Sequence, residues 1–276
     1  MTPEAAWVWQ GGRLVQYGRA PDKDYWTKLW AQVDREELLA GSREDLVLLA
    51  AFRRHLPREG RILEAGCGLG QWVQVLREEG FYIEGVDWSI ATIELLRRSV
   101  PHLPVWYGDV RQLPVPDGHY QAVIALGVVE HFPEGPAAVL REFVRILAAG
   151  GVLILSVPYV SPLRRLKAAV GWYRPTLPVA QVFYQYAFRL EEMDELLAAV
   201  GLHIEAHIPY DAVLGLRTEV GIVNALYRWT CKQGRGSRSQ PRGRRKRPWA
   251  RILHAASRLG LMRHLAGHMM LYVARR

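Results

Sequence analysis

Three glycines at every second position constrain this chain more than any other feature of its sequence. Gly66, Gly68 and Gly70 stand in the stretch Glu64–Trp72 (EAGCGLGQW), between the apolar run Arg61–Leu63 and a helical pattern that ends near position 79. Because glycine has no Cβ, it lets a strand turn sharply into a helix. The free N–H groups at the start of that helix can then face a ligand. The stretch therefore predicts a strand–turn–helix unit that binds a ligand at its turn.

Strands and helices alternate through the middle of the chain. Apolar runs predict five strands, and helical patterns separate most of them; the runs lie at 62–63, 82–86, 105–107, 122–126 and 152–157. Near-continuous Val, Ile and Leu runs are typical of parallel strands that are covered on both faces. A sixth strand is expected at 202–206, and an earlier helix from an N-cap at Ser42 to His55. The sequence therefore predicts an α/β fold with a doubly wound sheet and helices on both faces.

Acidic residues recur at the ends of successive predicted strands. Glu64, Asp87 and Asp109 are separated by 23 and 22 residues, each interval being one strand–helix unit. In a doubly wound sheet these ends meet at the carboxyl edge, where ligands bind. Asp87 is placed to accept both hydroxyls of a ribose, and Asp109 to accept a hydrogen bond from an exocyclic amine such as that of adenine.

Two ligands fit this outline, a dinucleotide and S-adenosylmethionine (SAM). The dinucleotide fingerprint is G-x-G-x-x-G, in which the third glycine allows close packing beneath the pyrophosphate. Here the position that the fingerprint needs is Gln71. SAM carries no phosphate and needs polar groups for its amino-acid end, so the spacing favours SAM.

The same motifs resemble the class I SAM-dependent methyltransferases, and most closely the branch that contains the ubiquinone- and menaquinone-pathway methyltransferases. Five segments carry the resemblance: Leu63–Gly70 (first motif), Gly85–Ser89 (ribose side), Gly108–Asp117 (adenine side), Val128–Phe132 and Leu147–Val157. It covers about 43–157 continuously and then 188–206. The resemblance implies a Rossmann-like, seven-stranded, mostly parallel sheet whose last strand, 268–274, inserts antiparallel beside the sixth. It also implies SAM as methyl donor, S-adenosylhomocysteine as product, and no metal.

The expected cofactor site follows from these motifs. Its residues are Glu64, Gly66, Cys67, Gly68, Gly70, Asp87, Trp88, Asp109, Val110, Leu126 and Gly127. Glu64 either contacts the SAM amino group or supports the loop, and Trp88 either packs on adenine or gives hydrophobic cover. Cys67 is expected to be a small packing residue. Methyl transfer is an in-line displacement whose leaving group needs no protonation, so alignment and exclusion of water can suffice.

His131 is the candidate catalytic base, because an imidazole titrates near the working pH. The pair Glu130-His131 also fits the start of a helix held by hydrogen bonds in this branch. Both interpretations stay open from the sequence.

The ends of the chain depart from the compact family pattern. Residues 1–41 form an aromatic segment, either a lid over the substrate pocket or a segment that packs on the main domain, 42–276. Irregular insertions are expected at 158–187 and 207–267. The identity of the methyl acceptor and its attacking atom therefore stay open, as does the oligomeric state.

Basic charge is concentrated at the C-terminal end. The net charge is +9, yet residues 220–276 hold 14 Arg and Lys and no acid, which leaves 22 basic and 27 acidic residues elsewhere. The run Lys232–Arg247 has eight basic residues in sixteen and is expected to be a mobile loop, and 249–266 a basic amphipathic helix. This tail could aid solubility, contact an anionic membrane surface or, less favoured, bind nucleic acid.

We therefore expect a SAM-dependent methyltransferase that acts on a small-molecule or lipid-linked acceptor. No apolar stretch approaches the roughly 18–20 residues of a membrane-spanning helix, and Met1–Glu4 do not resemble a secretory signal. Two distant cysteines, Cys67 and Cys231, are expected to be reduced thiols in a cytoplasmic protein, with peripheral contact to the inner membrane surface as an option. The alternatives are an RNA or protein methyltransferase that uses the basic tail and a non-catalytic SAM-binding subunit.

Overall fold

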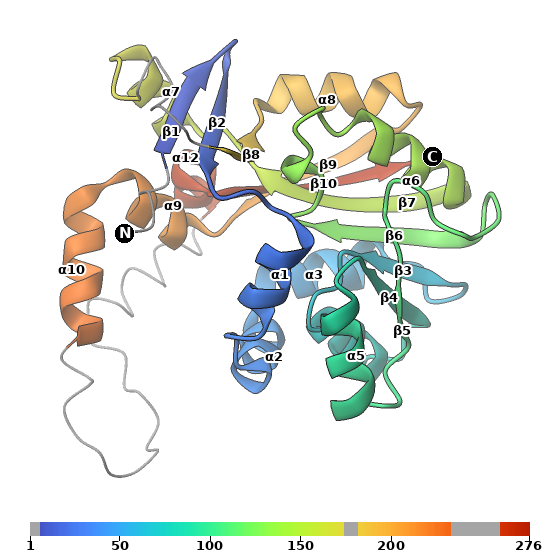
Figure 1. Ribbon diagram of the computed structural model, residues 1–276. Coiled ribbons are helices and arrows are strands. Elements are labelled where there is room, and N and C mark those ends of the chain that lie inside the picture. Colours follow the sequence, from blue (N-terminus) through green and yellow to red (C-terminus); the bar gives the residue numbers. More distant parts are fainter. Residues whose placement is uncertain (1–5, 174–181, 233–259) are drawn as a thin grey trace.

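The computed structural model describes residues 6–173, 182–232 and 260–276. A seven-stranded sheet with the order β5-β4-β3-β6-β7-β10-β9 lies at its centre (Figure 1). The strands are β3 (Ile62–Ala65), β4 (Ile83–Asp87), β5 (Val105–Tyr107), β6 (Tyr120–Leu126), β7 (Leu147–Pro158), β9 (His203–Tyr210) and β10 (Met269–Arg275). The first five pair in parallel, whereas β10 is antiparallel to both β7 and β9. The predicted fold class, including the inserted antiparallel last strand, is confirmed.

Helices cover both faces of this sheet. One face packs against α3 (Leu46–His55), α4 (Gln71–Glu78) and α5 (Ile90–Ser99). The other packs against α6 (Ala137–Ile146) and α8 (Leu190–Ala199). Strand β7 shows why its sequence is continuously apolar: Val152 and Ile154 enter the first core, while Leu153 and Leu155 enter the second. A strand that is buried on both faces needs apolar residues at every position.

The helix expected to begin at Ser42 begins later. Ser42 lies inside α2 (Arg35–Glu44), where its hydroxyl donates to the carbonyl of Leu38. Asp45 instead caps α3, because its carboxylate accepts from the backbone N–H groups of Val47 and Leu48. Both residue types are good N-caps, and the sequence pattern did not separate them. The predicted end at His55 is confirmed.

The leading segment joins a second, smaller sheet. Strands β1 (Ala6–Gln10) and β2 (Arg13–Gly18) form a hairpin, and β2 pairs antiparallel with β8 (Val182–Ala187). Helix α1 (Lys23–Trp30) then leads to the main domain. The expected insertion at 158–187 therefore contributes a strand to the sheet that the first residues build.

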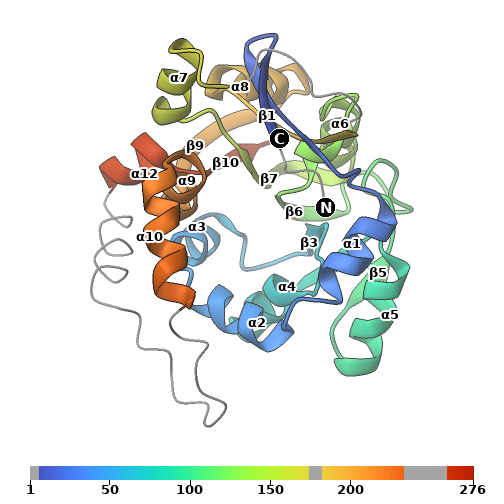
Figure 2. The ribbon, with the colours of Figure 1, turned by 60° about the vertical axis from the view of Figure 1, so that its left-hand side comes forward.

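Four more helices lie together on one side of the molecule in both views (Figures 1 and 2). They are α7 (Pro162–Ala169), α9 (Ala212–Glu219), α10 (Gly221–Lys232) and α12 (Gly260–Ala266). The basic loop expected at 232–247 lies outside the described residues apart from Lys232. Of the amphipathic helix expected at 249–266, only the part that forms α12 is described.

A buried ionic cluster fixes α7 to the end of α9. Arg164 is fully buried; its Nε donates to Glu219 Oε1 at 2.8 Å, and its Nη1 to the carbonyl of Tyr159 at 3.0 Å. Lys167 Nζ and Tyr173 Oη both donate to Glu219 Oε2 at 2.7 Å. These partners hold the pKa of Glu219 below its usual value against the opposing effect of burial, Arg164 making the largest of their contributions.

Replacement Glu219→Ala is expected to lower the free energy of unfolding by about 3–5 kcal/mol, because it leaves the buried Arg164 charge without its carboxylate. Urea unfolding measures this change. Glu191→Ala is the matched control, because Glu191 of α8 pairs with the exposed Arg165 of α7. Loss of this exposed ion pair should lower the free energy of unfolding by less than about 1 kcal/mol. Equal effects of the two replacements would contradict the description of Glu219 as the carboxylate of a buried ionic cluster.

Candidate active site

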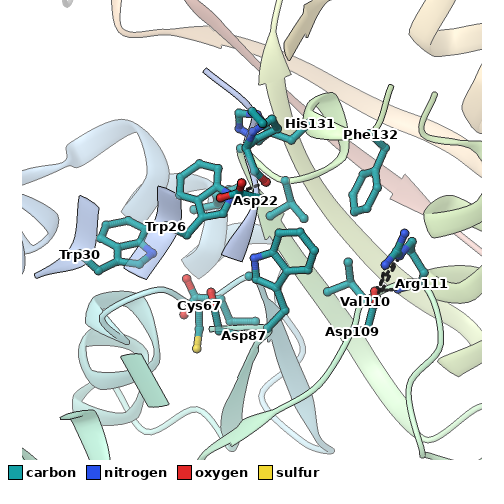
Figure 3. Close-up of a pocket in the computed structure, with 18 of the residues that line it drawn as sticks. Asp22, Trp26, Trp30, Cys67, Asp87, Asp109, Val110, Arg111, His131 and Phe132 are labelled. Carbon is teal, nitrogen blue, oxygen red and sulfur yellow. Dashed lines mark hydrogen bonds and ion pairs between the residues drawn. The ribbon is translucent and has the colours of Figure 1, made fainter. Parts of the chain in front are cut away.

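A cavity of about 460 Å³ opens at the carboxyl edge of the sheet (Figure 3). Ten of the twelve residues predicted for the site line it: Glu64, Gly66, Cys67, Asp87, Trp88, Asp109, Val110, Leu126, Gly127 and His131. Gly68 and Gly70 belong to the same loop but are not among the residues that line the cavity. Predicted residues from four strand ends thus meet in one place.

The glycine loop needs its glycines for close approach. Gly66 has φ +75°, and a Cβ there would lie 2.5 Å from Val128 Cγ2, which follows β6. Gly68 has φ +51°, and a Cβ there would lie 2.7 Å from Cζ2 of Trp30. The loop can therefore lie against neighbouring segments only because these positions lack a side chain. Gly70, with φ +65°, is the N-cap of α4.

Asp87 links this loop to the end of β4. Its buried carboxylate accepts from the N–H of Gly68 and from the N–H of Ser89, each at 2.9 Å. Burial raises the pKa of Asp87, and these hydrogen bonds oppose the rise. Each carboxylate oxygen can accept a further hydrogen bond. A pair of ligand hydroxyls in the cavity would therefore find acceptors here.

Glu64 supports the start of α4 and also lines the cavity. Its Oε2 accepts from the N–H of Val73 at 3.0 Å, in the first turn of that helix. Burial raises the pKa of Glu64 well above the usual value, and the nearby Asp87 raises it further. Glu64 therefore supports the loop, and its place in the cavity lining leaves it within reach of a ligand.

Asp109 carries a partner that the sequence interpretation missed. Arg111 donates from Nε and Nη2 to its two carboxylate oxygens, at 2.6 Å for the shortest contact (Figure 3). Hydrogen bonding to Arg111 holds the pKa of Asp109 below its usual value. Arg111 also lies 5.7 Å from the ring centroid of Phe132, and both residues line the cavity. Only the short Asp-x-Arg spacing signalled this pair in the sequence.

Cys67 behaves as a packing residue. It is 1% exposed, and burial raises the pKa of its thiol well above the usual value. A Cβ on Gly85 of β4 would lie 2.8 Å from its sulfur, so the side chain fills the space that this glycine leaves. Reactive cysteines carry a lowered pKa, and Cys67 is therefore unsuited to be a nucleophile.

His131 is held as a neutral imidazole. Its Nδ1 lies 2.9 Å from the carbonyl oxygen of Tyr184 in β8, which can only accept, so this nitrogen carries the proton. Edge-on contacts with the rings of Trp26 and Tyr184, at 4.9 and 5.0 Å, fix the ring plane. Burial lowers the pKa of His131 to about 4. Nε2 is left as a hydrogen-bond acceptor.

Its neighbour Glu130 is buried, and burial raises the pKa of its carboxyl to about 8. Within the part of the chain that is described, its Oε2 has no hydrogen-bond partner. The carboxyl is thus neutral near pH 7. One sequence interpretation expected hydrogen bonds of the pair Glu130-His131 to hold the start of a helix. At the short helix η1 (Val129–His131) the carboxyl of Glu130 accepts from its own backbone N–H, and His131 is held by the carbonyl of Tyr184.

Helix α1 roofs the cavity with two tryptophans, Trp26 and Trp30, which line it (Figure 3). On one side Thr27 Oγ1 and Ser89 Oγ are 2.8 Å apart, and Lys23 Nζ donates to Tyr107 Oη at 2.9 Å. On the other side the hydroxyl of Tyr25 donates to that of Tyr184 at 3.1 Å. The aromatic segment at 1–41 was the sequence signal for this roof.

Replacement Gly66→Ala is expected to lower the free energy of unfolding by about 2–4 kcal/mol, because a left-handed backbone and a steric overlap add together. Gly80→Ala is its control, since Gly80 has φ +86° but no atom within 4 Å of an added Cβ. It should cost only about 1–2 kcal/mol. Similar losses in thermal or chemical unfolding would contradict the close approach of Val128.

The imidazole of His131 is expected to stay neutral in the folded protein until the pH falls toward about 4. An unfolded histidine binds its proton near pH 6.5, so this residue favours folding above that value, and the contribution is lost as the pH falls through about 6 to 4. Resolved imidazole signals in an NMR titration measure the midpoint. A midpoint at or above 6.5 would show that the ring is not held as described.

Comparison with protein families matches residues 31–207 to a model described as a methyltransferase domain. A probable S-adenosylmethionine-dependent methyltransferase of Mycolicibacterium smegmatis is 29% identical over 144 residues, 52% of this chain and 52% of that protein. A ubiquinone biosynthesis O-methyltransferase of Acinetobacter baylyi is 25% identical over 153 residues, 52% of this chain and 64% of that protein. The match thus spans only about half the length of the first of these relatives.

A solved structure agrees in fold. It is a complex between the Haloferax volcanii Trm112 methyltransferase activator and a methyltransferase, and the similar chain has a TM-score of 0.57 at 17% identity, with 91% of this chain and 96% of that chain covered. Such a likeness shows the fold alone. The family model covers well over half of the residues, which confirms the family predicted from the motifs. This chain therefore belongs to the methyltransferase-domain family and has the fold of the SAM-dependent methyltransferases.

Proposed function

We propose that this domain transfers the methyl group of SAM to a small-molecule or lipid-linked acceptor. The observation that carries the proposal is that one cavity joins the Asp87 carboxylate to the aromatic side chains under α1. Its volume of about 460 Å³ lies in the range of small-ligand sites, about 300–1,000 Å³. A polymer substrate would have to pass beneath helix α1 to reach the methyl group, so the enclosed cavity favours a small acceptor.

The lining residues fit SAM by their chemistry. Asp87 would accept the ribose hydroxyls, and Glu64 would face the ammonium of the amino-acid end. Trp88 and Val110 would pack on the adenine, near Asp109, whose carboxylate is already turned toward Arg111. The missing side chain of Gly66 leaves the loop backbone open to the ligand. SAM would supply an electrophilic methyl group on a sulfonium.

The acceptor is proposed to lie against Trp26, Trp30, Phe132 and His131. These side chains offer apolar faces and one hydrogen-bond acceptor, Nε2 of His131. This suits an aromatic or apolar molecule with one hydroxyl or amine to be methylated. The name of the Acinetobacter baylyi relative, a ubiquinone biosynthesis O-methyltransferase, supports the same class of acceptor.

His131 is proposed to take the acceptor proton at Nε2 when the attacking O–H or N–H must lose it. Its carbonyl partner on Tyr184 supports this role by holding the proton on Nδ1. The low pKa, about 4, makes His131 a weak base, and this fits an acceptor that becomes acidic as the methyl group transfers.

The first 41 residues are proposed to act as a lid, as one sequence interpretation has it. Helix α1 is joined to the domain by polar contacts of Lys23, Thr27 and Tyr25 and by the rings of Trp26 and Trp30, and no residue of α1 is buried. A helix held this way can open to admit SAM and then exclude water during transfer.

The proposed partners include an anionic membrane surface, which residues 232–266 would contact. Among the described residues, no helix is long and apolar enough to cross a membrane. A lipid-linked acceptor would then be reached from the surface of a bilayer.

Replacement Asp87→Asn is expected to weaken SAM binding at least about tenfold, because the ribose hydroxyls lose a charged acceptor. Calorimetric titration measures the dissociation constant, with circular dichroism as a check that the variant is folded. Asp117→Asn is the control, since Asp117 is largely exposed and pairs with Arg145 outside the cavity. An unchanged affinity of the folded Asp87→Asn variant for SAM would contradict the proposed cofactor site.

The acceptor class has its own test. Methyl-labelled SAM is incubated with the protein and a cell extract, and the label is followed into three fractions: organic-soluble small molecules, protein and RNA. Transfer to the organic fraction, reduced by His131→Ala with SAM affinity kept, is the expected result. Label that appears only in protein or RNA would overturn the acceptor class.

A further inference from the structure

The lining of the cavity carries an excess of negative charge. Among its residues, all of them in the described part of the chain, one is basic, Arg111, and its guanidinium is bound to Asp109. Five are acidic: Asp22, Glu64, Asp87, Asp109 and Glu134. Bound SAM would bring a single net positive charge to the two acids of the proposed cofactor site. Asp22 and Glu134 then remain without a positive counterpart.

These two carboxylates lie at the proposed acceptor end of the cavity. Asp22 is the N-cap of α1, where its Oδ1 accepts from the N–H of Tyr25 at 2.7 Å. Glu134 closely follows Phe132 in the chain, and both acids are exposed to solvent. Neither forms an ion pair with a described residue, although Glu134 acts on Arg111 from beyond ion-pair distance. Their negative charge is therefore available to a ligand.

Lys23, which follows Asp22 in the sequence, does not offset this charge. It is not a lining residue of the cavity. Its Nζ donates to Tyr107 Oη at 2.9 Å and lies 5.8 Å from the ring centroid of Trp88. The ammonium of Lys23 is thus held at the strand ends of the proposed adenine side.

Aromatic rings lie beside the two carboxylates. Trp26 and Trp30 of α1 line the cavity with Asp22, and Phe132 lines it from the segment after β6 (Figure 3). The rings of Trp26 and Trp30 are nearly parallel, with an angle of 25° and centroids 6.2 Å apart. A cation is attracted to the face of an aromatic ring, and aromatic rings are the usual surroundings of bound alkylammonium groups.

A further carboxyl lies next to the cavity. Glu130 is 1% exposed, and its Oε2 has no hydrogen-bond partner in the described part of the chain. A Cβ on Gly127, which lines the cavity, would lie 3.5 Å from Glu130 Oε1. A buried acceptor without a partner is costly, and a positive charge nearby favours the ionised form of a carboxyl. Glu130 therefore also suits a cationic group in this part of the site.

We propose that the methyl acceptor is an amine with an aromatic or apolar body, and that its nitrogen is the atom that is methylated. This inference rests on the proposed function and narrows the acceptor from a hydroxyl or amine compound to an amine. The cavity would hold the cationic group between the carboxylates of Asp22 and Glu134 and the tryptophan rings of α1.

The chemistry of an amine fits the charge of the cavity. The lone pair of the neutral nitrogen forms the bond to the methyl carbon, while the carbon–sulfur bond breaks and its electron pair stays on sulfur. The positive charge thus passes from sulfur to nitrogen and remains among the acids. An amine needs no base before it attacks, which suits the weakly basic Nε2 of His131; this atom would accept the amine N–H and orient the lone pair.

Binding of small probes that differ in charge tests the proposal. The full chain, saturated with S-adenosylhomocysteine, is titrated in a calorimeter with benzyltrimethylammonium, benzyl alcohol and benzoate, which share one aromatic ring. The cation should bind at least about tenfold more tightly than the other two, because only the cation gains from the carboxylates and the ring faces. Equal binding of the three probes, or tighter binding of benzoate, would overturn the proposal.

Charge-neutral variants locate the effect. The double variant Asp22→Asn with Glu134→Gln should bind benzyltrimethylammonium at least about fivefold more weakly and benzyl alcohol unchanged, and Asn keeps the N-cap of α1. Asp24→Asn with Glu59→Gln is the matched control, since it removes the same charge at exposed positions outside the cavity. Equal losses in the two double variants would show an effect of overall charge and contradict the site.

The position of the transferred methyl group decides the attacking atom. Labelled small molecules, formed from methyl-labelled SAM and a cell extract, should be retained by a cation exchanger in dilute acid. They should keep their label in hot hydriodic acid, which removes methyl groups from oxygen and not from nitrogen. Label released as methyl iodide would overturn the amine and leave the proposed function intact. Absence of SAM binding by the wild-type chain would instead contradict the proposed function itself.

Discussion

The site depends on the buried carboxylate of Asp87. By accepting from the backbone of Gly68 and of Ser89, it ties the glycine loop after β3 to the turn after β4. Glu64 acts in the same way one strand earlier, since it holds the first turn of α4. Two buried acids thus set the shape of the loop, and both keep oxygen lone pairs that a ligand can use. The interactions that stabilise the fold here also shape the proposed cofactor site.

The other half of the cavity is built by parts of the chain outside the seven-stranded sheet. Strand β8 belongs to the smaller sheet, and it supplies the carbonyl that orients His131 and the hydroxyl that meets Tyr25 of α1. Trp26 and Trp30 come from α1 itself. In the proposed function, cofactor chemistry therefore belongs to the seven-stranded sheet and acceptor chemistry to the added elements. This division explains why the motifs identify the donor of the methyl group and leave the acceptor open.

The features that could be predicted from the sequence are those that recur at regular intervals along the chain. Runs in the sequence placed six strands of the large sheet, and the family resemblance implied the seventh; the spacing of Glu64, Asp87 and Asp109 predicted that they share an edge. Interactions between distant segments could not be predicted. The pairing of β2 with β8 joins positions about 170 residues apart with no shared pattern. Arg111 was missed because its role depends on a rotamer, and Ser42 was wrongly chosen as a cap because Asp45 offered the same chemistry three residues later.

Hydrogen exchange with and without SAM tests the central claim most directly, because it locates binding on the backbone. Saturating SAM should slow exchange in the loop 64–73, in the strand-end turns 87–89 and 109–111, and in the roof 20–30, which surround the cavity. Helices α6 and α8, which pack on the face of the sheet opposite to α4, should exchange at an unchanged rate. Protection of the loop, the turns and the roof together is the result that we predict. No protection at saturation, or protection only outside these segments, would contradict the assignment of this cavity as the SAM site.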